Sequence, residues 1–146
     1  MPVSKLAQLI RPAGYYNIKA RRLKNFLDFF FKNYSASVKN ISGKDLFLLR
    51  KELLAVNGIG QETADSMLLY ALNKPIFVVD AYTRRIFSRH KLIPESADYS
   101  QTQRFFMDNL KPDTKMFNEY HALIVKLGKD FCRKNNPRCQ ACPLNK

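Results

Sequence analysis

The stretch that decides the fold runs from residue 53 to residue 60 and reads Leu53-Leu54-Ala55-Val56-Asn57-Gly58-Ile59-Gly60. Its apolar first half ends one predicted helix, and its glycines interrupt the chain before a second helix begins at Gln61. We expect Gly58 and Gly60 to take positive φ and to expose N–H groups at the start of that second helix. Because a helix N-terminus favours an anion, the stretch predicts a phosphate-binding hairpin that Ile59 anchors in the core. A turn that only joins two helices is the alternative interpretation.

The sequence on either side of this hairpin predicts an all-α fold. Apolar residues recur at helical spacing in segments that short connections separate. The predicted helices cover residues 18–34, 42–54, 61–72, 80–90, 105–110 and 117–131. Asn17 is expected to cap the first of them, and Asp80 to begin the fourth. Residues 76–79 are consistent with either a short strand or a buried extended segment.

The charge of the chain is strongly positive and unevenly spread, with a formal net value of +13. Residues 1–50 hold 10 basic and 2 acidic side chains, residues 51–100 hold six of each, and residues 101–146 hold nine and four. A neutral middle between basic flanks favours a chemical centre held between polyanion-binding surfaces, so we expect a nucleic-acid partner. A basic surface that only confers solubility is the alternative.

Composition excludes several other classes of protein. Hydrophobic residues make up 46% of the chain and aromatic residues 12%, which is enough for a packed core in one domain's length of chain. No apolar run approaches the roughly 18 residues needed to cross a bilayer. Residues 1–5 hold no apolar signal-peptide region, so export is not expected. We expect a cytoplasmic, nucleoid-associated monomer with no membrane contact.

The hairpin is similar to the helix-hairpin-helix motif of the endonuclease III superfamily of DNA glycosylases. Twenty residues after Gly60, a second segment resembles the one that carries this family's catalytic aspartate, with Asp80 at the matching position. It reads Val78-Val79-Asp80-Ala81-Tyr82-Thr83-Arg84-Arg85. The resemblance runs from about Leu6 to the C-terminus. It implies two all-α lobes that bind double-stranded DNA across the cleft between them, contacting it through the backbone of Asn57, Gly58, Ile59 and Gly60.

Asp80 suits the chemistry that the resemblance implies. Cleavage of an N-glycosidic bond builds positive charge on the sugar, as in glycoside hydrolysis. An ionised carboxylate beside C1′ stabilises that charge and can orient or deprotonate a water molecule, after the damaged base has been flipped from the duplex. Without the resemblance, Asp80 is most simply a helix N-cap. The two roles are compatible.

Glu62 departs from the pattern of the bifunctional family members. Those enzymes carry a lysine two residues after the second glycine of the hairpin, and that lysine forms a Schiff base with C1′. Glu62 occupies the matching position, and a carboxylate cannot form a Schiff base. We therefore expect base removal without strand cleavage. The run Gly-Ile-Gly-x-Glu-Thr-Ala-Asp resembles the 3-methyladenine DNA glycosylase branch, which implies an alkylated base. For Glu62 itself, a first-turn acid on a helix dipole is the simpler role.

Three cysteines lie near the end of the chain with the spacing C-x6-C-x2-C: Cys132, Cys139 and Cys142. Clustered thiolates without an export signal favour a metal or an iron–sulfur cluster over disulfides. The family's cluster loop is similar, with the pattern C-x6-C-x2-C-x5-C around a [4Fe–4S] cluster. Its fourth ligand would fall just beyond Lys146. Zinc is the alternative.

The resemblance also implies how the chain is organised. Residues 1–131 would form the helical glycosylase region and residues 132–146 a partial iron–sulfur loop. The family has further helices before the segment that matches residues 6–24, so we expect a chain truncated at both ends. A monovalent cation held by hairpin carbonyls is a further expectation. His90 and His121 have no metal partner at a telling spacing and are predicted to be structural.

The sequence therefore predicts a base-excision DNA glycosylase with Asp80 as its catalytic carboxylate. Two enzyme alternatives are an endonuclease III-type lyase, in which another amine replaces the missing lysine, and a mismatch-specific glycosylase. The alternative from another class is a non-catalytic helix-hairpin-helix module that only binds DNA. The presence of Asp80 at its distance from Gly60 argues against that module.

Overall fold

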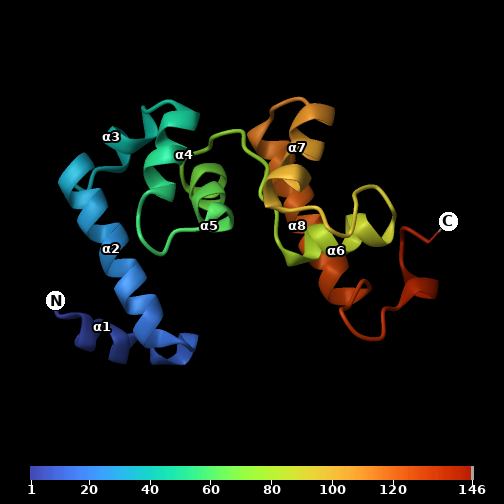
Figure 1. The fold of residues 1–146 in the computed structure, drawn as a ribbon, viewed down its shortest axis with the longest axis horizontal. Helices are drawn as coiled ribbons and strands as arrows, with labels where there is room; N and C mark the ends of the chain where they lie inside the picture. Colours follow the sequence, from blue (N-terminus) through green and yellow to red (C-terminus); the bar gives the residue numbers. More distant parts are fainter. Residues whose placement is uncertain (146) are drawn as a thin grey trace. The chain divides into compact units, whose positions relative to one another are not determined.

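A computed structural model describes residues 1–145, which form helices joined by short connections (Figure 1). The described residues contain no β-strand, so the prediction of an all-α fold is confirmed. The chain divides into two compact units, Met1–Ala64 and Asp65–Lys146. The separate prediction of a boundary after residue 131 stays a prediction. Among residues 1–145, none of the helices has the length and apolar composition that crossing a bilayer requires.

The first unit is built on one long helix, α2 (Tyr16–Tyr34), against which the short N-terminal helix α1 (Val3–Leu9) packs (Figure 1). The helix starts earlier than predicted, and Asn17 does not cap it. The Tyr15 carbonyl accepts the first helical hydrogen bonds, so Tyr15 is the N-cap, in the left-handed conformation, and Asn17 lies within the first turn. A 3-10 turn, η1 (Arg11–Ala13), connects α1 to α2.

Two further helices complete this unit, α3 (Val38–Ser42) and α4 (Leu46–Leu54). Asp45 caps α4 by accepting hydrogen bonds from the N–H groups of Phe47 and Leu48, both at 2.9 Å. Leu49 and Leu53 of α4 are fully buried. The buried hydroxyl of Tyr34 donates to the carboxylate of Glu52, which ties the end of α2 to α4.

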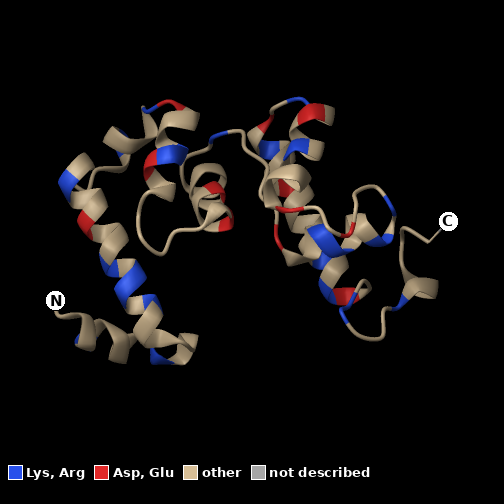
Figure 2. Cartoon of the chain, in the orientation of Figure 1, with Lys and Arg blue, Asp and Glu red and all other residues tan. Residues whose placement is uncertain are grey.

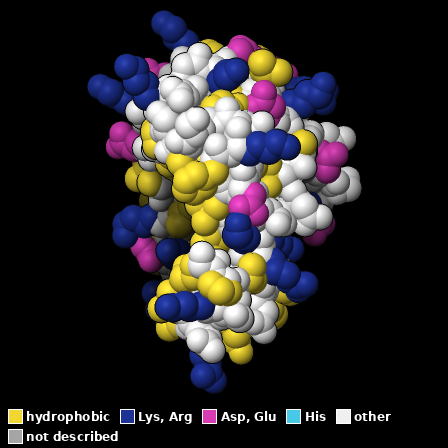
Figure 3. All heavy atoms as spheres, turned by 90° about the vertical axis from the view of Figure 1, so that its left-hand side faces the viewer, with side chains coloured by type: hydrophobic (Ala, Val, Ile, Leu, Met, Phe, Trp, Pro, Cys, Tyr) yellow, Lys and Arg dark blue, Asp and Glu magenta, His cyan; other side chains and the backbone are white. Residues whose placement is uncertain are grey.

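Several apolar side chains on the surface of the first unit are exposed to solvent. Phe31, Val38 and Phe47 are each more than half exposed. Figure 3 shows hydrophobic side chains gathered between scattered lysine and arginine side chains on the face that it presents. Exposed apolar side chains that cluster in this way are typical of a surface that another element covers.

The second unit contains three main helices: α6 (Ala81–Arg89), α7 (Tyr99–Asn109) and α8 (Thr114–Asp130). Each begins at an aspartate whose side chain accepts hydrogen bonds from the first turn, namely Asp80, Asp98 and Asp113. Before them, α5 (Gln61–Ser66) crosses the boundary between the units and continues as a π-helical turn, η2 (Met67–Ala71). The predicted helices of this region are confirmed, although α7 starts well before residue 105.

Residues 76–79 form a buried extended segment and not a strand. Phe77 stacks on Phe106 with ring centroids 3.9 Å apart and meets the edge of Phe117 at 5.4 Å. The segment's backbone bonds to side chains instead of a neighbouring strand. The Phe77 carbonyl accepts from Gln103 Nε2 at 2.6 Å, and the Val79 N–H donates to the Tyr99 hydroxyl at 3.4 Å. The segment therefore leads rigidly from the core to Asp80.

Candidate active site

The hairpin is exposed at three of its four residues, since Asn57, Gly58 and Gly60 lie in solvent. Ile59 is 8% exposed, so it anchors the turn as expected. Gly58 has a φ of +97°, but Gly60 does not have positive φ, which corrects the prediction for that residue. The carbonyl of Gly60 accepts from Ala64 N at 2.9 Å and already belongs to the first turn of α5.

The basic face of α2 supports the hairpin within the first unit. A Cβ placed on Gly58 would lie 2.3 Å from Cγ of Arg22, so only glycine fits at this position. Asn25 donates from Nδ2 to the Asn57 carbonyl at 3.0 Å. A cavity of about 390 Å³ lies beside this contact and is lined by Val3, Ile18, Arg21, Arg22, Lys24, Asn25 and Asn57. Its three basic side chains suit an anionic ligand.

Asp80 lies at the start of α6 in the second unit, with its side chain 13% exposed. One carboxylate oxygen, Oδ1, accepts from the Thr83 N–H at 2.7 Å and from the Thr83 hydroxyl at 2.9 Å. The other oxygen, Oδ2, lies 3.6 Å from Nε2 of His121. Asp80 is therefore a helix cap whose second oxygen is not used for capping, so capping is compatible with a chemical role.

His121 projects from α8 and connects Asp80 to Tyr70 of η2. The Tyr70 hydroxyl is hydrogen-bonded to Nδ1 of His121. Burial lowers the pKa of His121, and the negative charge of Asp80 partly opposes that shift. Burial and the same negative charge raise the pKa of Tyr70. The ring of His121 therefore connects the half-exposed phenol of Tyr70 to the half-buried carboxylate of Asp80.

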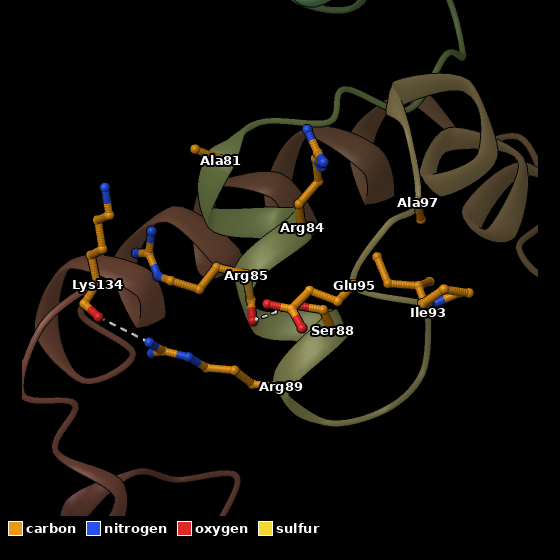
Figure 4. Close-up of a pocket in the computed structure, with 10 residues that line it drawn as sticks. Ala81, Arg84, Arg85, Ser88, Arg89, Ile93, Glu95, Ala97 and Lys134 are labelled. Atoms are coloured by element: carbon orange, nitrogen blue, oxygen red, sulfur yellow. Dashed lines mark hydrogen bonds between the residues drawn. The ribbon is translucent and has the colours of Figure 1, made fainter.

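Basic residues also lie along α6, and Figure 2 marks Lys and Arg positions on both α2 and α6. A cavity of about 580 Å³ is lined by three basic residues of α6, Arg84, Arg85 and Arg89, together with Lys134, Ser88 and Glu95. In Figure 4, Arg85 and Arg89 extend from α6 toward the segment that carries Lys134, while Arg84 points elsewhere. The basic residues outnumber the one carboxylate, so this surface also suits an anion.

The three cysteines line one small cavity of about 150 Å³ in the second unit. All three are free thiols in the structure. Within residues 1–145, no group of three His, Cys, Asp or Glu residues is arranged closely enough to hold a metal ion. The residue types suit a thiolate-bound cluster, although the three thiols are not gathered into a metal site in this structure.

Two arginines of α6 hold the cysteine segment in place. Arg85 donates from Nε to the Cys132 carbonyl at 2.8 Å and from Nη2 to the Gly128 carbonyl at 3.3 Å. Arg89 donates to the carbonyls of Arg133 and Lys134, at 2.7 and 3.0 Å, and lies 3.5 Å from Sγ of Cys132. The C-terminal half of α6, the helix that Asp80 caps, therefore binds the cysteine segment.

Residues 1–112 match the family described as HhH-GPD superfamily base excision DNA repair protein. The chain belongs to this superfamily. That match covers both the hairpin and Asp80. Glu62, which the sequence predicts to stand at the position of the family lysine, is exposed in the first turn of α5.

Similar curated proteins support the same family. The "Putative DNA repair glycosylase MJ1434" of Methanocaldococcus jannaschii is 52% identical over 96% of this HhH-GPD chain and 64% of its own length. Endonuclease III of Sulfolobus acidocaldarius is 29% identical over 97% of this chain and 60% of its own length. The chain thus spans about three fifths of the length of these relatives.

Solved structures share the fold. A trapped endonuclease III–DNA covalent intermediate matches with a TM-score of 0.82 and 24% identity, over 99% of this chain and 63% of that one. Helicobacter pylori 3-methyladenine DNA glycosylase bound to 1,N6-ethenoadenine matches with a TM-score of 0.73 and 31% identity, over 88% of this chain and 64% of that one. The HhH-GPD fold predicted from the sequence is confirmed.

Sequence reasoning missed three residues around Asp80. Thr83 follows Asp80 at the spacing of a cap, which is a usable signal. Tyr70 and His121 lie 51 residues apart in the chain and carry no joint signal. The prediction that His121 is structural rests on its lack of a metal partner at a telling spacing in the sequence.

Gly58→Ala should destabilise the protein, whereas Gly60→Ala should not. Alanine at position 58 would have to adopt positive φ and displace Arg22, which together cost about 1–3 kcal/mol. At position 60 a Cβ meets no atom within 4 Å, so the change should stay within about 0.5 kcal/mol. Chemical denaturation of the two variants measures both effects. Equal destabilisation would contradict this account of the hairpin.

Proposed function

We propose that this chain is the catalytic region of a base-excision DNA glycosylase that hydrolyses the N-glycosidic bond of a damaged base. The observation that carries the proposal is Asp80 itself. Its carboxylate is half-buried at the start of α6, fixed through Oδ1 by Thr83, with Oδ2 free of capping bonds. The family match over residues 1–112 includes this position.

The proposed reaction uses the negative charge of Asp80. The base leaves with the electron pair of the glycosidic bond, and positive charge develops on the sugar. An ionised carboxylate stabilises that charge in a site from which water is partly excluded. A water molecule then adds to C1′, and Asp80 orients it or accepts its proton. The products are a free base and an abasic site.

We infer that base release is not followed by strand cleavage. Glu62 is exposed in the first turn of α5, at the position of the Schiff-base lysine, and a carboxylate cannot act as that nucleophile. An alkylated base is the proposed substrate. Alkylated purines carry positive charge and leave readily, and the 31%-identical structure is that of a 3-methyladenine DNA glycosylase.

Double-stranded DNA with a damaged base is the proposed partner of a monomeric protein. The hairpin would contact the phosphate backbone through Asn57–Gly60, with a monovalent cation held by hairpin carbonyls. The cavity lined by Arg21, Arg22 and Lys24 and the cavity on α6 would supply further phosphate contacts. These contacts read the backbone and not the base sequence.

A second candidate is an endonuclease III-type glycosylase and lyase for oxidised pyrimidines. The observation that favours it is the similarity to endonuclease III of Sulfolobus acidocaldarius over nearly the whole chain. It would need another amine in place of the family lysine. A covalent enzyme–DNA intermediate, which borohydride traps, distinguishes the two candidates.

We also propose that Cys132, Cys139 and Cys142 supply three of the four ligands of a [4Fe–4S] cluster. Its support is the shared cavity of the three thiols and the arginine contacts that hold their segment. The cluster would have a structural role, fixing the segment that carries Arg133, Lys134 and Arg138 toward DNA. Zinc remains the alternative metal for the same thiolate ligands.

Asp80→Asn should slow base release at least about 100-fold, the scale of a positioned charged group. The amide keeps an oxygen that can accept the Thr83 bonds, so α6 keeps its cap while the charge is lost. DNA affinity should stay the same or increase. Single-turnover release from duplexes with alkylated, oxidised and mismatched bases measures the effect. Asp113→Asn, at the equivalent cap of α8, is the matched control and should not slow release. An unchanged rate of base release in Asp80→Asn would mean that Asp80 serves only as a helix cap.

Borohydride should trap no covalent adduct with the unmodified chain, because Glu62 stands at the lysine position. Glu62→Lys should create trapping and strand cleavage if the geometry matches that of the bifunctional enzymes. Gel electrophoresis of labelled duplexes separates these products. Efficient trapping by the unmodified chain would support the endonuclease III candidate.

Affinity for duplex DNA should fall steeply with salt, because a net charge of +13 displaces counterions from phosphates. Gly60→Leu should weaken binding to all sequences alike without loss of stability, since the position is open to solvent. Arg84→Gln should reduce the salt slope by about 1, the effect of one lost phosphate contact. Lys32→Gln, at the far end of α2, is the control. Fluorescence anisotropy between low and moderate salt measures the slopes. A flat salt response would contradict the proposed interface.

Protein purified without oxygen should contain iron and acid-labile sulfide. Cys139→Ser should lower both contents, since a hydroxyl does not replace a thiolate ligand of iron. Elemental analysis together with a sulfide assay measures them. Stoichiometric zinc without iron or sulfide would reject the cluster.

A further inference from the structure

The imidazole of His121 is held between a phenol and the proposed catalytic carboxylate. Tyr70 comes from η2, Asp80 from the start of α6 and His121 from the middle of α8, and α8 packs against both other elements. Nδ1 is bonded to the Tyr70 hydroxyl. Nε2 is buried without a hydrogen-bond partner among the described residues and lies 3.6 Å from Oδ2 of Asp80.

This arrangement differs from that of an ordinary structural histidine. Buried side-chain nitrogens are nearly always hydrogen-bonded, and leaving one unpaired is costly. Nε2 faces a carboxylate oxygen at a distance too long for a hydrogen bond. A movement of about 0.7 Å would bring the two atoms within hydrogen-bond distance. The unpaired atom is therefore placed to bond Asp80 after a small shift of the carboxylate, or through one water molecule.

The protonation state of the ring follows from its neighbours. Tyr70 keeps its proton because burial and the charge of Asp80 raise its pKa, so its hydroxyl can either donate to Nδ1 or accept from it. Burial lowers the pKa of His121, so the ring is neutral near pH 7 and carries one proton. Nε2 faces a carboxylate oxygen, which only accepts, so this geometry favours the proton on Nε2, with Nδ1 accepting from the Tyr70 hydroxyl.

Three other charged groups of the packed elements bond away from His121. Arg85 of α6 donates to the carbonyls of Gly128 and Cys132, at the opposite end of α8. On α8 itself, Lys126 pairs with Asp130 at 2.9 Å. The negative charge of Asp80 is the electrostatic cause that opposes the effect of burial on the pKa of His121.

We propose that His121 is a positioning residue for Asp80, with its neutral ring, fixed by Tyr70, directing Nε2–H at Oδ2 and holding the carboxylate in its reactive orientation. The proposal rests on the proposed role of Asp80. Thr83 fixes one oxygen of the carboxylate and His121 the other. The exposed hydroxyl of Tyr70 bonds to Nδ1, the other ring nitrogen.

A dependence on pH follows from this geometry. When His121 gains a second proton, its positive charge pairs with Asp80 and opposes the positive charge that develops on the sugar. Base release should therefore be full above the pKa of His121 and fall as the pH drops through it. Because burial lowers that pKa, the fall occurs below the ordinary titration range of histidine.

The first test follows the titration of the two histidine rings by nuclear magnetic resonance, without any substrate. His121→Gln identifies the His121 signal by its loss. Asp80→Asn should lower the pKa of His121, because the charge of Asp80 raises it in the unmodified chain. Asp113→Asn, which removes a cap charge at the start of α8, should leave that pKa unchanged. An unshifted His121 titration in Asp80→Asn would overturn the proposal.

The second test measures single-turnover base release against pH. His121→Leu should lower the rate about tenfold, less than the loss of a group that touches the reacting atoms. His121→Gln keeps a donor toward Oδ2, so it should restore most of the rate but lose the acid-side fall set by the histidine. DNA affinity should not change in either variant. A rate in His121→Leu equal to that of the unmodified chain, or an unaltered acid-side fall in His121→Gln, would overturn the proposal.

The two tests separate this proposal from the proposed function. If Asp80→Asn releases base normally, the catalytic role of Asp80 fails, whatever the histidine titration shows. If Asp80→Asn abolishes release and the His121 titration does not respond, Asp80 remains the catalytic carboxylate and the positioning role of His121 is rejected.

Discussion

Buried backbone N–H and C=O groups that have no partner strand must be hydrogen-bonded by other groups, and this requirement shapes the second unit. Residues 76–79 cross the core in extended form, and Gln103 and Tyr99 of α7 bind their backbone groups. The same two side chains also donate to the fully buried carboxylate of Asp65, at 2.7 and 2.8 Å. The helix α7 thus supplies hydrogen bonds both to a buried carboxylate and to the extended segment that leads to Asp80. The position of the candidate catalytic group therefore depends on α7, which takes no direct part in its chemistry.

The hairpin is constrained in a different way. Gly58 is required because Arg22 of α2 occupies the space that a side chain would need. The same arginine lines the basic cavity beside Asn57. Close packing and positive charge are thus supplied by one residue, so the turn at Gly58 and the charge beside it both depend on α2. A substitution of Arg22 would alter the packing and the charge together.

The sequence predicted the parts of the site that are contiguous in the chain. The hairpin, the capping position of Asp80 and most helix positions follow from local spacing and turn chemistry. Asn17 failed as a cap because the carbonyl of Tyr15 began the helix earlier. Gly60 failed as a positive-φ residue because it already caps α5. The contact among Tyr70, Asp80 and His121 was beyond sequence reasoning, since packing of α8 on two other elements creates it. The choice of lesion and of any metal that the thiols bind depends on surfaces and ligands that local patterns do not describe.

The arginines at the end of α6 bear on how the cysteine segment is assembled. Their hydrogen bonds go to backbone carbonyls of residues 128–134, and the structure has these bonds while all three thiols are free. The first cysteine is thus docked on α6 without the help of a ligand on its sulfur. For the proposed cluster, assembly would then complete a segment that is already attached at one end and would not have to organise a free chain. Loading would in that case follow the folding of the helix that Asp80 caps.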